Sequence, residues 1–259
     1  MGILDVIKHG RVIGMKMAGR VCVVTGGGRG IGKAIVEKFL EYGAEYVYAV
    51  DLNQDALTEL EGRYANVKGV VLSVTDTAAV NDFAGKVKEE KGRIDVLVNN
   101  AGVTKDALIH KMSDEDWQFV IDVNLKGPFI MTRAIGPMMM EQGKGTIVTI
   151  SSVVGLDGNI GQTNYAATKG GVVSMMKTWA REFSRKGANV RANAVAPGYI
   201  NTPMMATVPD KVLDPIKEKT YFKRLGEPSE IAEVVAFLAS DESSYVTGQV
   251  IRASGGLVI

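Results

Sequence analysis

The chain has 259 residues, a length that one large α/β domain often fills, with 46% hydrophobic and 23% charged residues, as in ordinary globular domains. Its 30 basic and 29 acidic side chains give a formal net charge of +1, and no basic patch stands out, which argues against a nucleic-acid partner. The apolar runs are far shorter than the roughly 20 residues of a membrane span, and no apolar stretch with a cleavage site precedes them, so we expect a cytoplasmic protein without membrane association.

Short apolar runs alternate with longer helix-like stretches along the chain. The runs are rich in Val and Ile and apolar on both faces, as strands of a covered parallel sheet are. Strands are predicted at residues 20–25, 46–51, 67–74, 94–99, 145–151, 189–196 and 249–253. Helices are predicted at residues 30–43, 53–62, 77–91, 114–140, 163–186 and 228–240. This alternation predicts an α/β fold, with a parallel sheet and helices on both of its faces.

No composition shift, repeat or low-complexity segment divides the chain. We therefore expect one domain over residues 16–259, preceded by an N-terminal extension of residues 1–15. The sequence leaves three roles open for the extension: it could be disordered, cover the surface, or reach a neighbouring subunit.

A glycine-rich loop, residues 25–32, follows the first predicted strand and opens the first helix. Glycine has no Cβ, so the backbone can approach a ligand, and the N–H groups of a helix N-terminus suit a pyrophosphate. Residues 27–33 also fit the spacing of a triphosphate-binding loop, but Ala34 follows where that loop needs a hydroxyl for a metal ion. A purely structural glycine turn is a second alternative. We predict a dinucleotide site, with contacts from Gly26, Arg29, Gly30, Ile31 and Gly32.

Asp51 ends the second predicted strand, 19 residues after Gly32. A carboxylate near this separation can accept both ribose hydroxyls of an adenosine, and it would repel a 2′-phosphate. Arg29 argues the other way because it could pair with a phosphate, yet Leu52 and Asn53, which follow Asp51, are not basic. We therefore predict NAD as the cofactor, with NADP as the less favoured alternative.

Tyr165 and Lys169 lie four residues apart, so on a helix they share a face. A nearby ammonium favours the ionised form of a phenol and lowers its pKa from about 10. A phenol with such a pKa can donate or accept the proton of an alcohol. Tyr and Lys at this spacing also occur by chance on solvated helices, so the pair needs support from the rest of the chain.

Ser152 and Asn124 supply that support. Ser152 follows the fifth predicted strand at its carboxyl end, where open α/β sheets bind ligands. Neither His9 nor His110 is near it in sequence to act as a base, so Ser152 is predicted to orient a carbonyl or hydroxyl rather than to attack. Asn124 lies inside a helical segment, where an amide is a poor helix former, and its position makes sense if it binds a water.

Cysteine and histidine exclude other chemistry. The single cysteine, Cys22, lies in a Val-rich strand and is expected to be a small buried apolar residue. His9 and His110 show no partner pattern, so no metal site is expected.

Together these motifs resemble the short-chain dehydrogenase/reductase family over essentially the whole chain after the extension. The matching residues are 25–32, Asp51, 99–102, Asn124, Ser152, Tyr165, Lys169, Pro197 and Gly198. The resemblance implies a single-domain Rossmann fold with a seven-stranded parallel sheet. It implies that Tyr165 is the acid in reduction and the base in oxidation, that Lys169 lowers the phenol pKa and holds the nicotinamide ribose, that Ser152 positions the reacting oxygen, and that Asn124 holds a relay water.

The resemblance implies further cofactor contacts beyond the glycine loop. These are Asp51, Leu52, Val74, Asn100, Ala101, Gly102, Tyr165, Lys169, Pro197, Gly198, Ile200 and Thr202. Within the family, residues 102–108, 123–127 and 161–165 are most similar to bacterial enzymes that reduce 3-oxoacyl groups on acyl carrier protein.

From this resemblance we expect an NAD(H)-dependent enzyme that interconverts a ketone and a secondary alcohol, most naturally a 3-oxoacyl thioester. Acyl carrier protein is then a candidate partner, and a homotetramer is the default assembly of the family. A dehydrogenase of a sugar, diol or other small alcohol is one alternative. A non-catalytic, NAD-sensing protein on the same fold is another.

Residues 199–222 contain Pro203, Pro209 and Pro215 together with Met204 and Met205. The pattern predicts a loop and a short helix above the ligand crevice. Because methionine adapts to varied apolar groups, this segment is either a mobile lid over an apolar chain or an ordinary surface connection.

Overall fold

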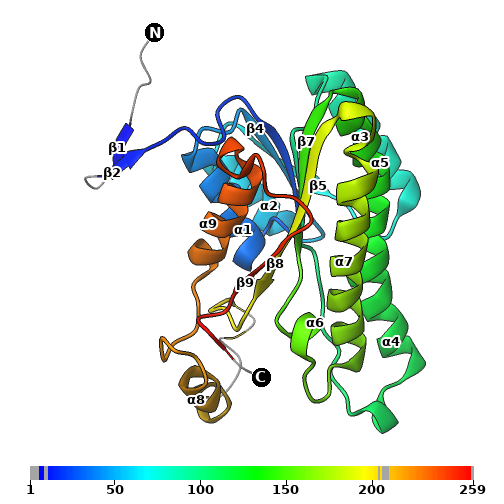
Figure 1. Cartoon of the computed structure of the whole chain (residues 1–259), viewed down its shortest axis with the longest axis vertical. Helices are drawn as coiled ribbons and strands as arrows, with labels where there is room; N and C mark the ends of the chain where they lie inside the picture. Colours follow the sequence, from blue (N-terminus) through cyan, green and yellow to red (C-terminus); the bar gives the residue numbers. More distant parts are fainter. Residues whose placement is uncertain (1–5, 9–10, 204, 206–209, 258–259) are drawn as a thin grey trace.

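The computed structural model describes residues 6–8, 11–203, 205 and 210–257 (Figure 1). Seven parallel strands form one sheet in the order β5-β4-β3-β6-β7-β8-β9. The strands are β3 (Val21–Thr25), β4 (Tyr46–Asp51), β5 (Val67–Val71), β6 (Val96–Asn99), β7 (Lys144–Ile150), β8 (Asn189–Pro197) and β9 (Val250–Ala253). The predicted Rossmann architecture is therefore confirmed. The strand order reverses between β3 and β6, which is where such sheets bind their ligands.

Three helices cover each face of the sheet (Figure 1). One layer contains α1 (Gly30–Glu41), α2 (Gln54–Arg63) and α9 (Pro228–Ala239), and the other contains α3 (Thr77–Lys91), α5 (Gly127–Glu141) and α7 (Thr163–Glu182). The five residues of β3 are all buried, because side chains on both faces of this central strand meet a helical layer. The cores on the two faces are the two largest hydrophobic clusters described, and they fix the helices against the strands.

The predicted helix over residues 114–140 is interrupted. It consists of α4 (Asp114–Ile121), a π-helical turn (Asp122–Lys126) and α5. The sequence did not predict α6 (Val154–Asp157). The short helix predicted within residues 199–222 is present as α8 (Asp210–Glu218). Short 3₁₀ turns lie at Ile109–Lys111, Arg185–Gly187 and Asp241–Ser243. The prediction failed at residues 122–126 because hydrophobic periodicity does not distinguish a continuous helix from one with a single wide turn.

The N-terminal extension contains a two-stranded antiparallel hairpin, formed by β1 (Val6–Lys8) and β2 (Arg11–Ile13). The sequence predicted no strand there. Figure 1 shows the hairpin standing away from the sheet and its helices. From residue 14 onward, the first fully buried side chain is that of Met17.

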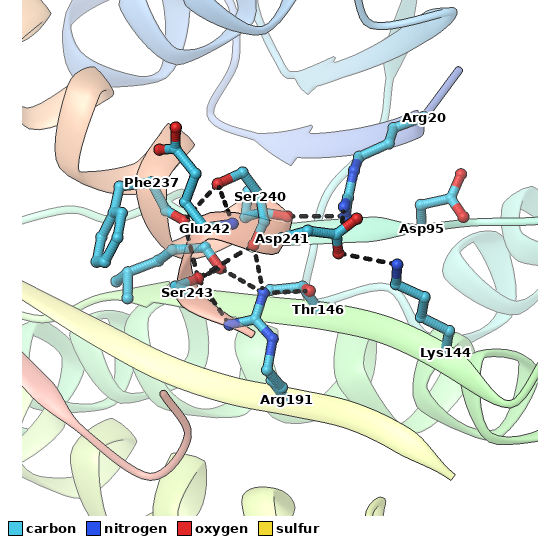
Figure 2. A network of polar contacts seen from close by, with 12 residues as sticks. Arg20, Asp95, Lys144, Thr146, Arg191, Phe237, Ser240, Asp241, Glu242 and Ser243 are labelled. Carbon is cyan, nitrogen blue, oxygen red and sulfur yellow. Dashed lines mark hydrogen bonds and ion pairs between the residues drawn. The ribbon is translucent and has the colours of Figure 1, made fainter. Parts of the chain in front are cut away.

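Two arginines bind the carboxyl end of α9 (Figure 2). Arg191 of β8, which is 6% exposed, donates to the Leu238 and Ser240 carbonyls at 2.9 Å each. Arg20 donates to the Ala239 carbonyl at 2.8 Å and forms an ion pair with Asp241 at 2.9 Å. The last carbonyls of a helix have no partner within the helix, so these guanidinium groups satisfy them and attach α9 to the sheet.

Several expectations concerned groups outside the ligand site. Cys22 is fully buried in β3, and burial raises the pKa of its thiol, so the group is an apolar core residue rather than a reactive one. None of the described helices is long and apolar enough to cross a membrane. Within the described ranges, no group of three or more His, Cys, Asp or Glu side chains is placed to hold a metal ion.

Candidate active site

A pocket of about 220 Å³ opens at the carboxyl ends of the central strands. Ten of the residues predicted from the sequence line it: Ile31, Asn100, Gly102, Ser152, Tyr165, Lys169, Pro197, Gly198, Ile200 and Thr202. They come from α1, α7 and the segments that follow β6, β7 and β8. The fold thus brings residues more than 150 positions apart in sequence to one site, which we call the active-site pocket.

Tyr165 lies in the first turn of α7, and Lys169 lies one turn later. The Lys169 Nζ is 5.6 Å from the centre of the Tyr165 ring. Lys169 is only 4% exposed, and its Nζ donates to the Ile150 carbonyl at 2.8 Å. Burial lowers the pKa of this ammonium to about 8, because a low-dielectric environment disfavours charge. The expected proximity of the two groups is present.

The pKa of Tyr165 differs from the sequence argument. Burial raises it to about 12, whereas a hydrogen bond with Ser152 acts to lower it. The spacing of Tyr165 and Lys169 predicted a lowered phenol pKa, because spacing along a helix says nothing about desolvation. In the structure the ammonium bonds to the Ile150 carbonyl, and burial of the phenol dominates.

Ser152 is the second residue after β7 and is 8% exposed. Its Oγ accepts the Val154 N–H at 3.1 Å. With one lone pair engaged, the hydroxyl can still donate its proton towards the phenol or towards a ligand oxygen. This arrangement suits the predicted role of orienting a carbonyl or hydroxyl.

Asn124 lies in the π-helical turn and is 1% exposed. Its Oδ1 accepts the Val103 N–H and its Nδ2 donates to the Val103 carbonyl, both at 2.8 Å. The side chain therefore attaches the turn to the segment after β6. Both polar atoms of the Asn124 amide are thus engaged, and the predicted binding of a water stays a prediction.

The glycine loop has the backbone that a close ligand requires. Gly26 and Gly30 have φ of 63° and 54°, which favours glycine. A Cβ at Gly32 would lie 1.9 Å from the Gly26 carbonyl oxygen. Behind the loop, α1 begins without a side-chain cap at Arg29 and without an acidic residue in its first turn. Its first N–H groups thus lack the side-chain acceptors that cap α2 and α3, which fits a pyrophosphate at this end.

Asp51 lies beside this loop, at the end of β4. Its Oδ2 accepts the Gly28 N–H and its Oδ1 accepts the Asn53 N–H, both at 3.0 Å. Leu52 next to it is 69% exposed, whereas Val74 is buried, and a Cβ at Gly127 would lie 2.7 Å from the Val74 Cγ2. The predicted cofactor residues Asp51, Leu52 and Val74 thus lie at the ends of β4 and β5 or within three residues after them.

Thr25, which the sequence placed in the glycine loop without predicting a contact for it, joins the loop to the pocket. Its Oγ1 accepts the N–H groups of Asn100 and Ala101 at 3.0 Å each. Asn100 in turn donates from Nδ2 to the Thr25 and Gly26 carbonyls. Its place at the end of the central strand, directly before Gly26, could have indicated this role.

Further residues line the active-site pocket without having been predicted. Among them are Thr104, Gln162 and Tyr199. Gln162 donates to Asp106 at 3.0 Å and accepts from Asn159 at 2.9 Å. Its position three residues before Tyr165, and that of Tyr199 directly after Gly198, could have indicated both.

The predicted lid region is described only in part. Met205 lines the active-site pocket, and α8 follows at Asp210–Glu218. Met204 and Pro209, on which the hypothesis also rested, lie outside the described residues. The lid therefore stays a prediction.

Comparison with known proteins places the chain in a family. A family described as enoyl-(acyl carrier protein) reductase matches residues 26–258. The chain is 51% identical over 249 residues to the 3-oxoacyl-[acyl-carrier-protein] reductase FabG of Thermotoga maritima, covering 95% of this chain and 100% of that protein. It is 42% identical over 243 residues to the FabG of Escherichia coli, covering 94% and 99%.

Two further proteins extend the comparison. The chain is 44% identical over 245 residues to an acetoacetyl-CoA reductase of a Synechocystis strain, covering 94% and 98%. The crystal structure of gox2181 superposes with a TM-score of 0.89 at 37% identity, covering 93% of this chain and 96% of that one. Similarity over nearly the full length of these relatives leads to one assignment: the chain belongs to the short-chain dehydrogenase/reductase family of oxidoreductases.

Proposed function

We propose that the protein reduces a 3-oxoacyl thioester to the 3-hydroxyacyl thioester with NADH, and catalyses the reverse oxidation with NAD. The observation that carries the proposal is the convergence of Tyr165, Ser152 and Lys169 in the active-site pocket, next to the uncapped start of α1. The names of the relatives, a 3-oxoacyl-carrier-protein reductase and an acetoacetyl-CoA reductase, support the substrate class.

The proposed mechanism divides the work among these residues. A bound nicotinamide cofactor supplies the hydride in reduction and accepts it in oxidation. Tyr165 donates the proton to the carbonyl oxygen in reduction, because a phenol with a pKa of about 12 is protonated at neutral pH. Ser152 donates a hydrogen bond that orients the same oxygen. In oxidation, Tyr165 must first lose its proton, so the reverse rate rises with pH.

Lys169 is proposed to supply positive charge beneath this site. Its pKa of about 8 leaves the ammonium largely protonated at neutral pH. A Cβ at Gly102 would lie 3.4 Å from the Lys169 Nζ, so the glycine keeps space open beside the ammonium. A ribose hydroxyl could accept a hydrogen bond there.

The glycine loop and α1 are proposed to hold the pyrophosphate, and Asp51 the adenosine ribose. The Asp51 carboxylate lies 3.0 Å from the Gly28 nitrogen, which puts a negative charge beside the loop where NADP would carry its 2′-phosphate. This repulsion is the reason for proposing NAD over NADP.

Replacing Asp51 by Asn tests the cofactor proposal. The substitution removes the charge and keeps one acceptor oxygen, so the preference for NADH over NADPH, measured as the ratio of kcat/KM, should fall roughly ten-fold or more, which corresponds to ~1.4 kcal/mol. Asp55→Asn, at an exposed site in the first turn of α2, is the matched control. An unchanged ratio in Asp51→Asn, or a wild type that prefers NADPH, would reject the proposal.

Two partners are proposed with the same activity. The thioester could be carried by acyl carrier protein, as the names of the relatives suggest. We also propose a homotetramer, the default assembly of the family. Trp117, Phe119 and Phe129 of α4 and α5 are between 37% and 44% exposed, and a contact between copies would cover such aromatic side chains. Light scattering on the purified protein measures this mass directly.

A substrate panel is the decisive experiment for the function. Acetoacetyl-CoA, acetoacetyl-carrier protein, a ketose and a hydroxyketone would each be supplied with NADH and with NADPH, and oxidation of the cofactor followed by absorbance. We expect the highest kcat/KM for a thioester. Higher values for the ketose or hydroxyketone would favour a sugar or diol dehydrogenase. Binding of NADH without turnover of any carbonyl would favour a cofactor-sensing protein.

A further inference from the structure

We propose that Arg252 is a positioning residue for the active site, acting on Ser152 through α6 and through residues 254–257, which we call the C-terminal turn. Arg252 lies on β9 and is not among the residues that line the active-site pocket. The inference rests on the proposed function, because it concerns how Ser152 is held against Tyr165.

Ser152 is attached to the start of α6. The Ser152 Oγ accepts the N–H of Val154, the first residue of α6, at 3.1 Å. The preceding N–H, that of Val153, donates to the Pro197 carbonyl at 3.0 Å. The direction of the Ser152 hydroxyl therefore depends on where the first residues of α6 are held.

Arg252 contacts the other end of α6. Its guanidinium forms an ion pair with Asp157, the last residue of α6. The same nitrogen donates to the Leu257 carbonyl at 2.7 Å. One side chain on β9 thus bonds both the end of α6 and the end of the C-terminal turn; α6 and β9 are labelled in Figure 1.

The C-terminal turn packs on α6. Leu257 is 2% exposed and packs in a cluster with Val153 and Val154, against which Tyr165 and Tyr199 also pack. The Leu257 N–H donates to the Ser254 carbonyl at 3.1 Å, which closes the turn. Arg252 therefore fixes α6 twice, directly through Asp157 and indirectly by holding Leu257 against residues that flank Ser152.

The ion pair between Arg252 and Asp157 is expected to position α6 rather than to stabilise the whole fold. The Arg252 and Asp157 side chains are 37% and 32% exposed, and ion pairs of this exposure contribute little to global stability. Small displacements of groups around a reacting centre, however, can cost up to about 10²-fold in rate. Loss of Arg252 should thus reduce turnover and leave the protein folded.

Three variants test the kinetic consequence. Arg252→Met keeps the apolar stem and removes the guanidinium, Asp157→Asn removes the facing charge, and a double variant carries both. With acetoacetyl-CoA and NADH we expect kcat to fall roughly ten-fold in each single variant, the Tm to stay near that of the wild type, and the double variant to be no worse than the poorer single one. Arg252→Lys, which can still pair with Asp157, should recover most of the activity.

The pH profile separates positioning from other effects. The hydrogen bond with Ser152 lowers the pKa of Tyr165, so loosening Ser152 should move the acid limb of 3-hydroxybutyryl-CoA oxidation to higher pH. Both single variants should shift it in this direction, although they change the local charge with opposite signs. Leu257→Ala, which disturbs the C-terminal turn without changing any charge, should shift it the same way.

A matched control removes an ion pair away from the active-site pocket. Lys88 of α3 pairs with Glu141 of α5 at 3.0 Å, and Lys88→Met should leave kcat and the pH profile unchanged. Wild-type kcat in Arg252→Met would overturn the proposal. Shifts of opposite sign in Arg252→Met and Asp157→Asn would overturn it too, because they would indicate a through-space charge effect.

Amide hydrogen exchange keeps the test independent of the substrate. Residues 153–158 should exchange faster in Arg252→Met than in the wild type, because α6 loses its contact with β9. If the wild type reduces no carbonyl, the proposed function is wrong and this measurement alone decides. Equal exchange in the two proteins would then overturn the role of Arg252, whereas faster exchange in the variant would support it.

Discussion

At the scale of single residues, burial decides the protonation of the two groups at the centre of the pocket. It raises the pKa of Tyr165 to about 12 and lowers that of Lys169 to about 8, because a low-dielectric environment favours the neutral form of both. At neutral pH the phenol is a proton donor and the lysine still carries most of its charge. In the proposed reaction, these protonation states suit proton donation to a carbonyl, and oxidation must work against the phenol pKa.

Replacing Tyr165 by Phe tests the proposed acid. The substitution removes one oxygen and keeps the ring, so kcat for acetoacetyl-CoA reduction should fall by at least ~10²-fold. Binding of NADH, followed by fluorescence titration, should be unchanged. Tyr245→Phe, at a fully exposed position, is the control and should keep full activity. Activity near that of the wild type in Tyr165→Phe would show that another group transfers the proton.

The hydrogen bond between Ser152 and Tyr165 predicts a change in pH dependence. The bond favours the ionised phenol and acts to lower the pKa of Tyr165, so Ser152→Ala should raise that pKa. Oxidation requires the deprotonated phenol, and its acid limb should accordingly move to higher pH, together with a lower kcat. Measuring kcat/KM for 3-hydroxybutyryl-CoA against pH, with Ser244→Ala at an exposed site as the control, checks the sign. A shift to lower pH would contradict it.

At the scale of elements, apolar patterning predicted the seven strands of the sheet and the long helices. Capping and tertiary contacts decided where these elements end and where the short helices form. The strand predicted over residues 67–74 ends at Val71, although the Leu72 N–H still bonds the Asp51 carbonyl. The wide turn at residues 122–126 coincides with the bonds between Asn124 and Val103, partners 21 residues apart whose contact no local pattern reveals. α6 has four residues, too few for a helical period to be visible.

The arginine contacts at the end of α9 predict a loss of stability when they are removed. Arg191→Met would leave the Leu238 and Ser240 carbonyls, the Ser243 hydroxyl and the Thr146 hydroxyl without this donor. Unsatisfied buried groups cost about 1–3 kcal/mol each, so we expect the free energy of unfolding to fall by about 3 kcal/mol, measured by urea denaturation. Arg181→Met, at an exposed site on α7, should have little effect. Equal stability of the two variants would mean that water replaces the guanidinium of Arg191.

At the scale of the whole molecule, the sequence predicted the architecture and most of the pocket because both depend on local signals. Strand ends, glycines and a helix start mark the pocket, and ten predicted residues line it. The sign of the Tyr165 pKa shift could not be predicted in this way, because desolvation depends on every element that covers the phenol. The contacts of Arg252 with Asp157 and of Arg191 with α9 span 95 and 47 positions, and for the same reason they appear only in the folded chain.

The hairpin at the start of the chain gives a prediction about domain limits. We propose that residues 16–259 are the folding unit, because Met17 is the first fully buried core residue from position 14 onward and the hairpin stands away from the body (Figure 1). Deleting residues 2–13 should leave the Tm, the kcat and the mass measured by light scattering unchanged. A smaller assembly with normal kcat would instead assign the extension to a subunit contact.

The uncapped start of α1 has a consequence for how stability and ligand affinity trade against each other. Most exposed helix ends are completed by their own sequence, as Asn53 and Asp76 complete α2 and α3, and a missing cap typically costs about 1 kcal/mol. At α1 that cost is borne by the free protein, and binding of the proposed pyrophosphate would recover it. A substitution that introduced a capping side chain at Arg29 would therefore raise the free energy of unfolding. The same side chain would compete with the proposed pyrophosphate for the first N–H groups of α1. At this position, a gain in the stability of the free protein would lower its affinity for the proposed cofactor.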